Sequence, residues 1–378
     1  MPTIGIVAGE VSGDLLGSHL IAALKKCRPD LKFVGIAGHR MTAEGAESLY
    51  PMERLAVRGY FEVLRHYWGL ARMRRELAQH FIKNPPDLFI GIDAPDFNLG
   101  LEFMLRRRGI KTLHYVSPSI WAWRRGRISK IRRAADHVLC LFPFEKAIYD
   151  EAGIPATYVG HPLADMIPLE QDVAAARAEL KITQPGLVIA LLPGSRQGEL
   201  DYMADLFIKA AMQIAQEVPD AQFLVPLITR ETRTKFEQAI FRNNAQELSF
   251  KLLFGHAHMA MAAADGIIVA SGTATLEAAL HKRPMVIAYR MSAWTWPIMK
   301  RMGYLPWVGL PNILAGRSVV PELLQDKATP EALADELLRM VFDKERVKAI
   351  QAQFTEMHHQ LRQNVGEKVA AVVLDQLK

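Results

Sequence analysis

The sequence contains few cysteines and no long hydrophobic run, and each shortage argues against a class of protein. Two cysteines in 378 residues, Cys27 and Cys140, make neither a disulfide framework nor a pair of metal ligands, which favours a reducing compartment. Residues 1–8 are apolar but carry no basic leader, and no uninterrupted apolar run reaches the roughly 18 residues that span a membrane. We therefore expect a cytoplasmic protein that is not integral to a membrane, with both cysteines as small core residues.

Several catalytic motifs are missing as well. The glycine-rich segment at residues 9–17 is not G-x-G-x-x-G and is not followed by G-K-[ST], so it predicts neither a dinucleotide site nor a P-loop. The chain has no D-x-D carboxylate pair for a metal–nucleotide complex, no H-E-x-x-H and no G-x-S-x-G. His256 and His258 are two residues apart, so they do not share a helix face, and they lack a third ligand. We expect neither a metal nor a cofactor.

Length and composition favour a folded protein of two domains. Hydrophobic residues make up 50% of the chain and charged residues 23%, which is typical of globular proteins, and 378 residues exceed one ordinary core. The net charge of +6 permits nucleic acid, anionic lipid or a phosphorylated substrate as partner. The charge alone does not choose among these partners.

Apolar strands alternate with helical segments along the chain. Five apolar segments precede a connecting region at residues 165–185 and five follow it: residues 3–8, 33–37, 88–92, 111–116 and 138–141, then 187–192, 223–227, 252–254, 266–270 and 284–289. Strands without alternating polar residues are typical of a parallel sheet covered by helices on both faces. The alternation predicts an α/β fold with two doubly wound, Rossmann-like domains at residues 1–168 and 169–345. We leave residues 39–56 unassigned and expect a loop at residues 310–316.

Two carboxylates follow the strand at residues 88–92. Asp93 is the first charged side chain past the carboxyl end of this strand, where ligands gather in parallel sheets. Pro95 suits the first turn of the helix that follows. Asp93 or Asp96 could belong to a catalytic site or could simply cap this helix, and the strand alone does not separate the two roles.

Glycine and hydroxyl residues follow three other strands. At residues 9–17, Ser12 or Asp14 could cap a helix whose amides bind an anion, or the segment could be a plain turn. The turn at residues 193–199 adds the guanidinium of Arg196. In the turn at residues 271–277, Glu277 could cap the helix or bind a ribose. Two such turns in the second half favour a nucleotide diphosphate over structural caps.

Two stretches combine aromatic and basic residues. Residues 60–75 place apolar side chains at helical spacing beside four arginines, which fits either a helix on an anionic membrane surface or a helix packed on the sheet. Residues 114–124 contain two tryptophans and lead into a basic cluster at residues 124–133, a plausible surface for phosphate and sugar.

Six separated motifs, in order along nearly the whole chain, resemble those of the lipid-A-disaccharide synthases: residues 9–17, 91–98, 114–124, 192–196, 271–277 and 310–316. The resemblance implies the two-domain glycosyltransferase fold called GT-B, with both domains facing one cleft. It also implies that residues 346–378 form a helical segment that packs on the first domain or is exchanged with a partner in a homodimer.

The resemblance further implies an inverting transfer from UDP-2,3-diacylglucosamine to 2,3-diacylglucosamine 1-phosphate (lipid X), giving the β-1′,6-linked lipid A disaccharide 1-phosphate and UDP. Asp93 matches the family's general base, which leaves Asp96 a supporting role. The residues matched to nucleotide binding are Gly194, Ser195, Arg196, Ser271, Gly272, Thr273, Thr275 and Glu277. Those matched to the substrate cleft are Glu10, Ser12, Gly13, Asp96, Asn98, His114, Ser117, Trp123, Arg124 and Asn312.

Because both substrates carry acyl chains, the helix at residues 60–75 becomes a predicted docking face on the cytoplasmic side of the inner membrane. Its apolar docking residues are Phe61, Val63, Leu64 and Trp68. We expect a peripheral protein on an anionic membrane surface, with no nucleic acid partner.

Two alternatives stay open at this point. Another UDP-sugar GT-B enzyme, either a peptidoglycan glycosyltransferase or a UDP-sugar 2-epimerase, would not need the aromatic and basic helix. A non-catalytic nucleic-acid-binding protein would need its arginines in one contiguous footprint, whereas here both halves carry them.

Overall fold

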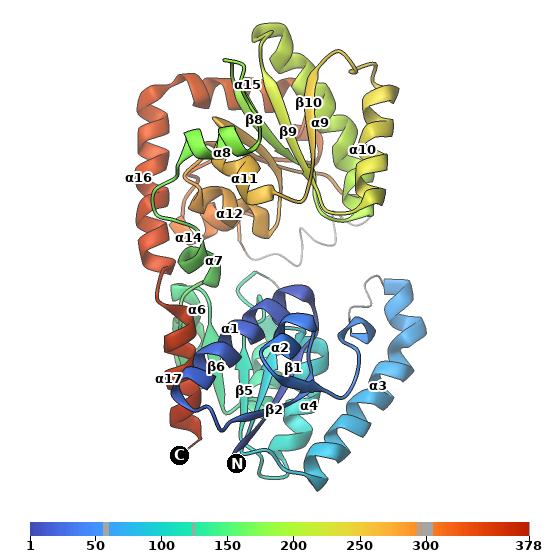
Figure 1. Ribbon diagram of the computed structural model, residues 1–378, viewed down its shortest axis with the longest axis vertical. Coiled ribbons are helices and arrows are strands. Elements are labelled where there is room, and N and C mark those ends of the chain that lie inside the picture. The colour runs from blue at the N-terminus through green and yellow to red at the C-terminus, as the bar shows by residue number, and fades with distance from the viewer. Residues whose placement is uncertain (56–59, 123–124, 293–295, 297–304, 378) are drawn as a thin grey trace. The chain divides into compact units, whose positions relative to one another are not determined.

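The chain folds as two compact units, each built on a parallel β-sheet. The computed structural model describes residues 1–55, 60–122, 125–292, 296 and 305–377, and the side chains of residues 60–67 lie outside this description. One unit comprises Met1–Asp165 with Leu361–Lys378, and the other comprises Met166–Gln360 (Figure 1). The alternation of strands and helices confirms the predicted α/β class with two doubly wound sheets.

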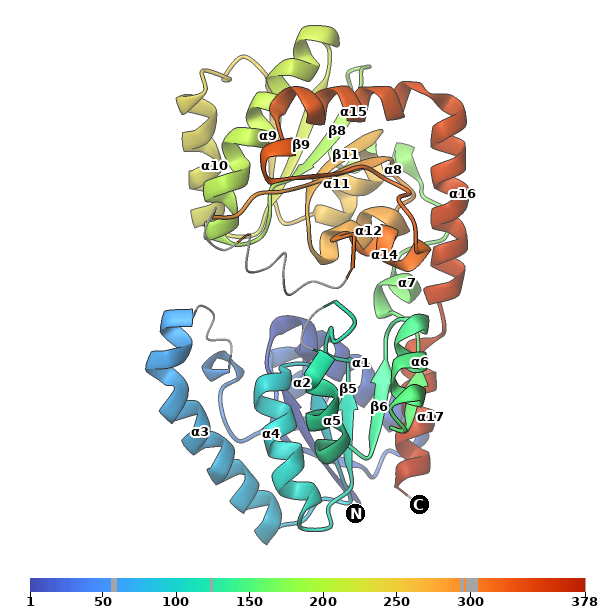
Figure 2. The same cartoon turned by 180° about the vertical axis from the view of Figure 1, so that it is seen from behind.

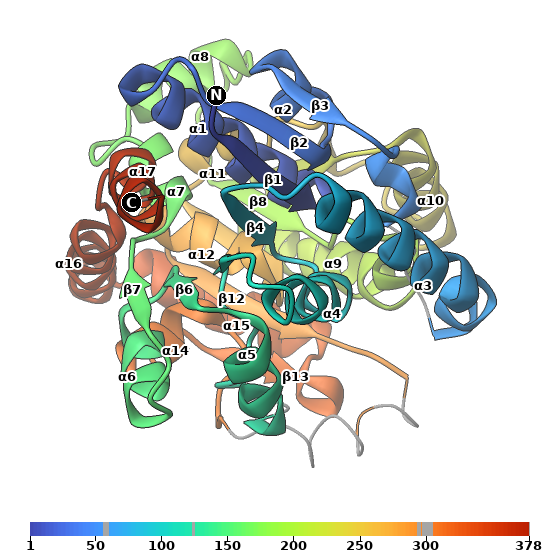
Figure 3. The ribbon, with the colours of Figure 1, turned by 90° about the horizontal axis from the view of Figure 1, so that it is seen from below.

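The first unit has seven parallel strands among its described residues, in the order β3-β2-β1-β4-β5-β6-β7. Their bounds are β1 (Thr3–Ala8), β2 (Lys32–Ile36), β3 (Ala46–Ser48), β4 (Leu88–Ile92), β5 (Thr112–Tyr115), β6 (His137–Cys140) and β7 (Ala156–Tyr158). One face is covered by α1 (Val11–Cys27), α2 (His39–Ala43) and α17 (Val365–Gln376), and the other by α3 (Tyr60–Lys83), α4 (Pro95–Arg106) and α5 (Ile128–Ala134) (Figures 2 and 3).

The second unit has six parallel strands within its described residues, in the order β10-β9-β8-β11-β12-β13. Their bounds are β8 (Val188–Leu192), β9 (Gln222–Leu227), β10 (Ser249–Phe254), β11 (Gly266–Ala270), β12 (Met285–Tyr289) and β13 (Glu322–Leu324). The helices α9 (Gln197–Glu217), α10 (Arg230–Arg242) and α15 (Pro330–Phe342) lie together, and α8 (Val173–Glu179), α11 (Ala257–Ala263), α12 (Thr273–Leu280) and α14 (Leu310–Ala315) lie on the opposite side of the sheet (Figures 1 and 2). Shorter or connecting helices are α6 (Pro143–Glu151), α7 (Pro162–Met166), α16 (Lys344–Leu361), η1 (Met52–Arg54), η2 (Arg125–Arg127) and η3 (Gln325–Lys327).

The central strands are buried along their full length. All five residues of β4, β8 and β11 are buried, as expected for strands covered on both faces. The last helix, α17, packs against α1 and adds Val365, Val369 and Val373 to the core of the first unit. This unit is therefore assembled from the beginning and the end of the chain.

The structure corrects three local expectations and assigns the segment that the sequence left unassigned. Residues 310–315, expected as a loop, form α14, and residues 39–54 contain α2, β3 and η1. Cys140 is buried, but Cys27 is exposed because it ends α1 at the surface. Asp14 does not cap its own helix: it accepts hydrogen bonds from the amides of Arg40 and Met41, each at 3.0 Å, and so caps α2.

Candidate active site

In both units the order of the strands reverses between two central neighbours, β1 and β4 in the first and β8 and β11 in the second. Doubly wound sheets bind ligands outside the carboxyl ends of such strands. The pairing Ala8↔Ile92 brings two predicted turns together in the first unit, and the pairing Leu192↔Val269 does the same in the second. Residues 9–13 thus lie beside residues 93–96, and residues 193–196 lie beside residues 271–275.

The turn at Asp93 is strained and tightly held. Asp93 and Ala94 have φ angles of 50° and 43°, in the left-handed region that costs a non-glycine residue about 1–2 kcal/mol. The amide of Asp93 donates to the carbonyl of Tyr115 at 2.9 Å. Gly9 makes room for the turn, because a Cβ there would lie 2.5 Å from that of Ala94. Strain of this kind clusters at functional sites, and here it places a carboxylate beyond the end of β4.

A buried polar cluster lies directly beneath this turn. Asn98, Glu102 and His114 are fully buried, and the Asn98 amide donates to the carbonyls of Val7 (3.3 Å), Ile92 (3.2 Å) and Asp93 (2.8 Å). His114 Nδ1 lies 2.7 Å from Glu102 Oε1. Burial raises the pKa of Glu102, and the neighbouring His114 opposes this shift. Asn98 and His114, predicted as cleft residues, are thus buried beneath the turn, where Asn98 bonds to the turn and His114 to Glu102.

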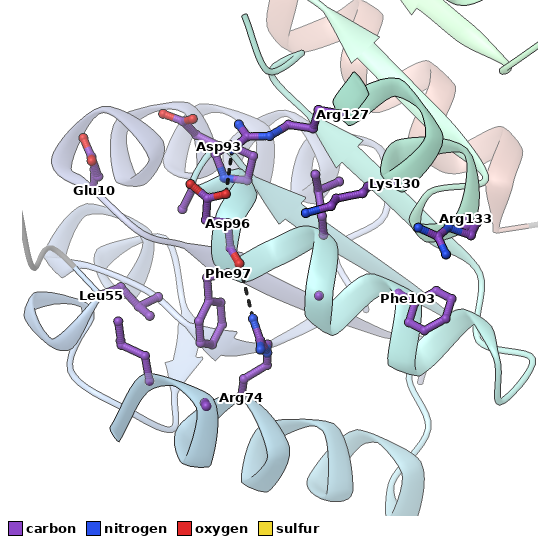
Figure 4. A pocket seen from close by; sticks show the side chains of 16 residues that line it. Glu10, Leu55, Arg74, Asp93, Asp96, Phe97, Phe103, Arg127, Lys130 and Arg133 are labelled. Carbon is purple, nitrogen blue, oxygen red and sulfur yellow. Dashed lines mark hydrogen bonds and ion pairs between the residues drawn. The ribbon is translucent and has the colours of Figure 1, made fainter. Parts of the chain in front are cut away.

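A pocket of about 770 Å³ opens beside Asp93 within the first unit (Figure 4). Three carboxylates, those of Glu10, Asp93 and Asp96, line it together with the apolar side chains of Leu55, Leu70, Phe97, Leu99 and Phe103 and the cations of Arg74, Arg127, Lys130 and Arg133. Such a pocket combines acidic, apolar and basic surfaces, which suits an amphiphilic ligand that carries hydroxyls and an anion.

Asp96 belongs to this pocket and does not cap α4. The N-cap residue is Ala94, without a side-chain capping bond, and the Asp96 side chain is 83% exposed. Its Oδ1 pairs with Nη2 of Arg127 at 2.6 Å, while its carbonyl accepts from Arg74 at 3.3 Å. The capping interpretation is therefore wrong for both carboxylates.

In the second unit, the side chain of Glu199 accepts hydrogen bonds from the amides of the turn after β8. Gly194 has a φ of 115°, and the amides of Ser195 and Arg196 both donate to Glu199 Oε2, at 3.0 and 3.3 Å. Arg196 also pairs with Glu199 Oε1 at 3.2 Å, and its side chain is 62% exposed. The amides expected to bind an anion are thus engaged by Glu199, whereas the guanidinium lies at the surface.

In the neighbouring turn after β11, some residues predicted to bind the nucleotide are exposed to solvent and another is buried. Gly272 and Thr273 are exposed, and Ser271 Oγ donates to the carbonyl of Val308 at 3.2 Å. Thr275 is fully buried, and its hydroxyl donates to the carbonyl of Gly272 at 2.7 Å and accepts from the amide of Leu310 at 3.3 Å. The Thr275 hydroxyl therefore holds the turn together, and its contact with a nucleotide stays a prediction.

Glu277 lies one turn further along α12, in a half-buried position. Burial raises the pKa of its carboxyl, and the nearby His258, whose Nε2 is 3.7 Å from Glu277 Oε2, opposes this shift. Within the described ranges, no group of three or more His, Cys, Asp or Glu side chains could hold a metal ion.

Comparison with known proteins identifies the family. The model of the lipid-A-disaccharide synthetase family matches residues 4–375. The lipid-A-disaccharide synthase of Methylobacillus flagellatus is 64% identical over 378 residues, which cover 100% of both chains. The chain belongs to the lipid-A-disaccharide synthase family. The enzyme of the same name from Dechloromonas aromatica is 56% identical over 98% of both chains. This confirms the resemblance, and it identifies a glycosyltransferase of lipid A biosynthesis rather than an epimerase or a nucleic-acid-binding protein.

Solved structures of low identity share the fold of this synthase family. The UDP-GlcNAc 2-epimerase of Neisseria meningitidis, bound to UDP-GlcNAc, has a TM-score of 0.62 at 11% identity, over 100% of this chain and 99% of that chain. The Anabaena protein HepE, in complex with UDP and glucose, has a TM-score of 0.57 at 16% identity, over 99% and 100% of the two chains. These neighbours support the GT-B fold for the family member described here.

The remaining residues matched to the synthase family are placed as follows. Ser12 is exposed and Gly13 is buried at the start of α1. Ser117 is buried, with its hydroxyl 2.8 Å from that of Tyr149. Asn312 is fully buried in α14 and bonds only to the protein: its amide donates to Val320 O and Glu322 Oε1, and its Oδ1 accepts from the amides of residues 319 and 320. Ser117 and Asn312 thus bond to groups within the protein, and their role in the substrate cleft stays a prediction. Trp123 and Arg124 lie outside the described residues.

The predicted docking helix, α3, packs on the sheet, which is one of the two alternatives that the sequence left open, and its membrane role stays a prediction. Its second half packs on the sheet through Met73, Leu77 and Phe81, which are buried. Trp68, nearer its beginning, is 78% exposed. The side chains of Phe61, Val63 and Leu64 lie outside the described residues. Among the described residues, none of the helices has the length and hydrophobicity of a membrane span.

Sequence reasoning missed Glu102, Arg74 and Glu199 as residues of these sites. Glu102 follows Asn98 by four residues on the same helix face, which is the one signal that could have linked them. Arg127, Lys130 and Arg133 recur every three residues, so the basic cluster could have been assigned to one helix face.

Proposed function

We propose that Asp93 is the general base in the transfer of 2,3-diacylglucosamine from UDP to the 6-hydroxyl of 2,3-diacylglucosamine 1-phosphate. The observation that carries this proposal is the Asp93 carboxylate on its strained turn. It lies in a pocket that apolar and basic side chains also line. A positioned carboxylate of this kind contributes about 10²–10⁴ to the rate of proton transfer.

The reaction requires one displacement. Asp93 takes the proton of the acceptor 6-hydroxyl as its oxygen forms a bond to the anomeric carbon of the donor. The bond from that carbon to the UDP oxygen breaks, and UDP leaves with the electron pair. Attack from the face opposite UDP inverts the anomeric centre and gives the β-1′,6 linkage. Charge stabilisation at the leaving diphosphate is the main requirement of such a transition state.

We assign the donor to the turns after β8 and β11. Because Glu199 engages the amides of Ser195 and Arg196, the surface groups are the better candidates for the diphosphate: the Arg196 guanidinium and the Thr273 hydroxyl. Gly272 lets the ligand approach the backbone, and Glu277 is suited to accept hydrogen bonds from a ribose. Ser271, Gly194 and Thr275 shape the turns.

The decisive experiment incubates the purified protein with UDP-2,3-diacylglucosamine and the acylated sugar phosphate. We expect UDP and the β-1′,6-linked disaccharide. Asp93→Asn should lower kcat by at least about 10²-fold, while UDP affinity stays unchanged. Asp96→Asn is the matched control, since this carboxylate is 83% exposed and pairs with Arg127, so its loss should cost little stability. A near-normal rate for Asp93→Asn would refute the base assignment, and epimerised donor in the absence of acceptor would support an epimerase instead.

We also propose that α3 docks the enzyme to the cytoplasmic face of the inner membrane through Phe61, Val63, Leu64 and Trp68. The support is the exposed Trp68 next to Arg72 and Arg75, because indole rings favour the membrane interface and arginines favour anionic lipids. Trp68→Ser should weaken flotation with anionic vesicles. Phe241→Ser, at a 66% exposed aromatic residue of α10, is the control. Equal flotation of both variants and the wild type would refute the docking proposal.

A further inference from the structure

Four cations line the pocket beside Asp93, and two of them are engaged at its acidic end. Arg127 pairs with the Asp96 carboxylate at 2.6 Å, and Arg74 donates to the Asp96 carbonyl at 3.3 Å. The other two, Lys130 and Arg133, lie farther from Asp93 along the wall formed by α5 (Figure 4).

Lys130 and Arg133 are placed where they could bind the anion of a ligand. They are three residues apart on α5, about 4.5 Å along the helix axis, and so share one face. Arg133 donates from Nε to the carbonyl of Ser129 at 3.3 Å and lies 5.9 Å from the ring centre of Phe103. Among the side chains that the structure describes, no carboxylate forms an ion pair with either residue.

The charge pattern of the pocket also fixes the direction in which an anionic ligand can bind. Glu10, Asp93 and Asp96 repel an anion from the end where the reaction occurs, whereas Lys130 and Arg133 attract it at the other. Phe97, Leu99 and Phe103 of α4 line the pocket as well and offer contact to hydrocarbon. The ligand that fits is an acylated sugar with its hydroxyl at Asp93 and its anion at α5.

We propose that Lys130 and Arg133 form the subsite that binds the phosphate monoester of the acceptor. This inference rests on the proposed function for the identity of the acceptor. A phosphate monoester carries about −1.5 to −2 charges at neutral pH, which two cations balance. By holding the phosphate away from the carboxylates, the subsite directs the 6-hydroxyl toward Asp93.

The test compares the phosphorylated acceptor with the same sugar lacking its phosphate, in micelles of a neutral detergent. Lys130→Met and Arg133→Gln should each raise the KM for the phosphorylated acceptor about tenfold or more, which is about 1.4 kcal/mol, and leave the donor KM unchanged. For the acceptor without phosphate, both variants should equal the wild type. Arg132→Gln is the matched control, because this arginine of α5 donates to the carbonyl of Ala152 and does not line the pocket.

Three outcomes would overturn the assignment. Equal losses for both acceptors would make the two residues structural, and unchanged KM values would remove them from the site. A defect that appears only in anionic phospholipid vesicles, with the micelle assay unaffected, would assign them to membrane phosphates instead. Binding of the phosphorylated acceptor without donor, measured calorimetrically in the same micelles, tests the subsite even if no transfer occurs, so failure of the proposed reaction remains distinguishable.

Discussion

Replacing Asn98 by alanine tests whether the buried cluster positions Asp93. The Asn98 amide bonds to three main-chain carbonyls, those of Val7, Ile92 and Asp93, at the ends of the two central strands. No other residue type of similar size supplies two donors at this place. Asn98→Asp would bring carboxylate oxygens against the same carbonyls and should be worse than alanine.

The expected loss has two parts. The amide has two hydrogens, so one is shared between two of the three carbonyls, and a net contribution of about 0.5–1.5 kcal/mol per hydrogen bond predicts a free energy of unfolding lower by about 1–3 kcal/mol. The bond to the Asp93 carbonyl also restrains a turn with two left-handed residues, each costing about 1–2 kcal/mol, so its removal favours relaxation of the turn. A displacement of the carboxylate by about 1 Å costs roughly 10²-fold in rate. We therefore expect kcat to fall about 100-fold with little change in the KM of either substrate.

Urea unfolding measures the loss of stability, and steady-state kinetics at 25 °C measure the loss of kcat. Asn84→Ala is the control, since Asn84 is exposed in the same unit and its amide donates only to the carbonyl of His80 at 3.3 Å. If Asn98→Ala lowers stability but keeps the wild-type kcat while folded, the Asp93 turn does not depend on Asn98 and the reasoning is wrong.

Three further predictions concern stability. Gly91→Ala would place a Cβ 2.1 Å from Glu102 Oε1 and should lower the free energy of unfolding by about 1–3 kcal/mol, so an unchanged urea midpoint would contradict the packing described. Asn312→Ala should lower the free energy of unfolding by about 2–4 kcal/mol in the same assay. A variant that loses activity but keeps its full stability would instead indicate that Asn312 binds substrate. Burial lowers the pKa of His281 to about 3, so the unfolded chain binds a proton below about pH 6.5 that the folded state does not. Stability should therefore fall as the pH drops from about 6.5 toward 3, and His281→Gln should make melting temperatures less sensitive to pH in this range.

The positions of the functional turns could be predicted from the sequence because they follow from local pattern. Uninterrupted apolar strands imply parallel sheets, and parallel strands place their following turns at one edge, so the turns that carry Asp93 and Arg196 could be located without any contact information. The strands at residues 3–8, 88–92 and 266–270 match the structure, and the ends of the other predicted strands differ by at most three residues, without effect on the turns that follow them.

The direction of buried polar side chains could not be predicted in the same way. Asn98, Thr275 and Asn312 have the chemistry of ligand-binding residues, but the structure turns each toward main-chain groups of the protein. The partners of Asn312 come seven to ten residues later, in a segment without a recognisable pattern. Asp14 reaches amides 26 and 27 residues away. Such bonds depend on tertiary packing, which a local pattern does not contain.

The packing of α17 against α1 has a consequence for the order of events during synthesis. Residues 1–165 leave the ribosome first, but the core that they form includes Val365, Val369 and Val373. The second unit, residues 166–360, is complete in sequence before the first one is. A nascent chain must therefore keep the side of α1 that α17 covers, which includes Ala23, exposed while a whole second unit is made. During that interval the beginning of the protein is the part most in need of protection from aggregation.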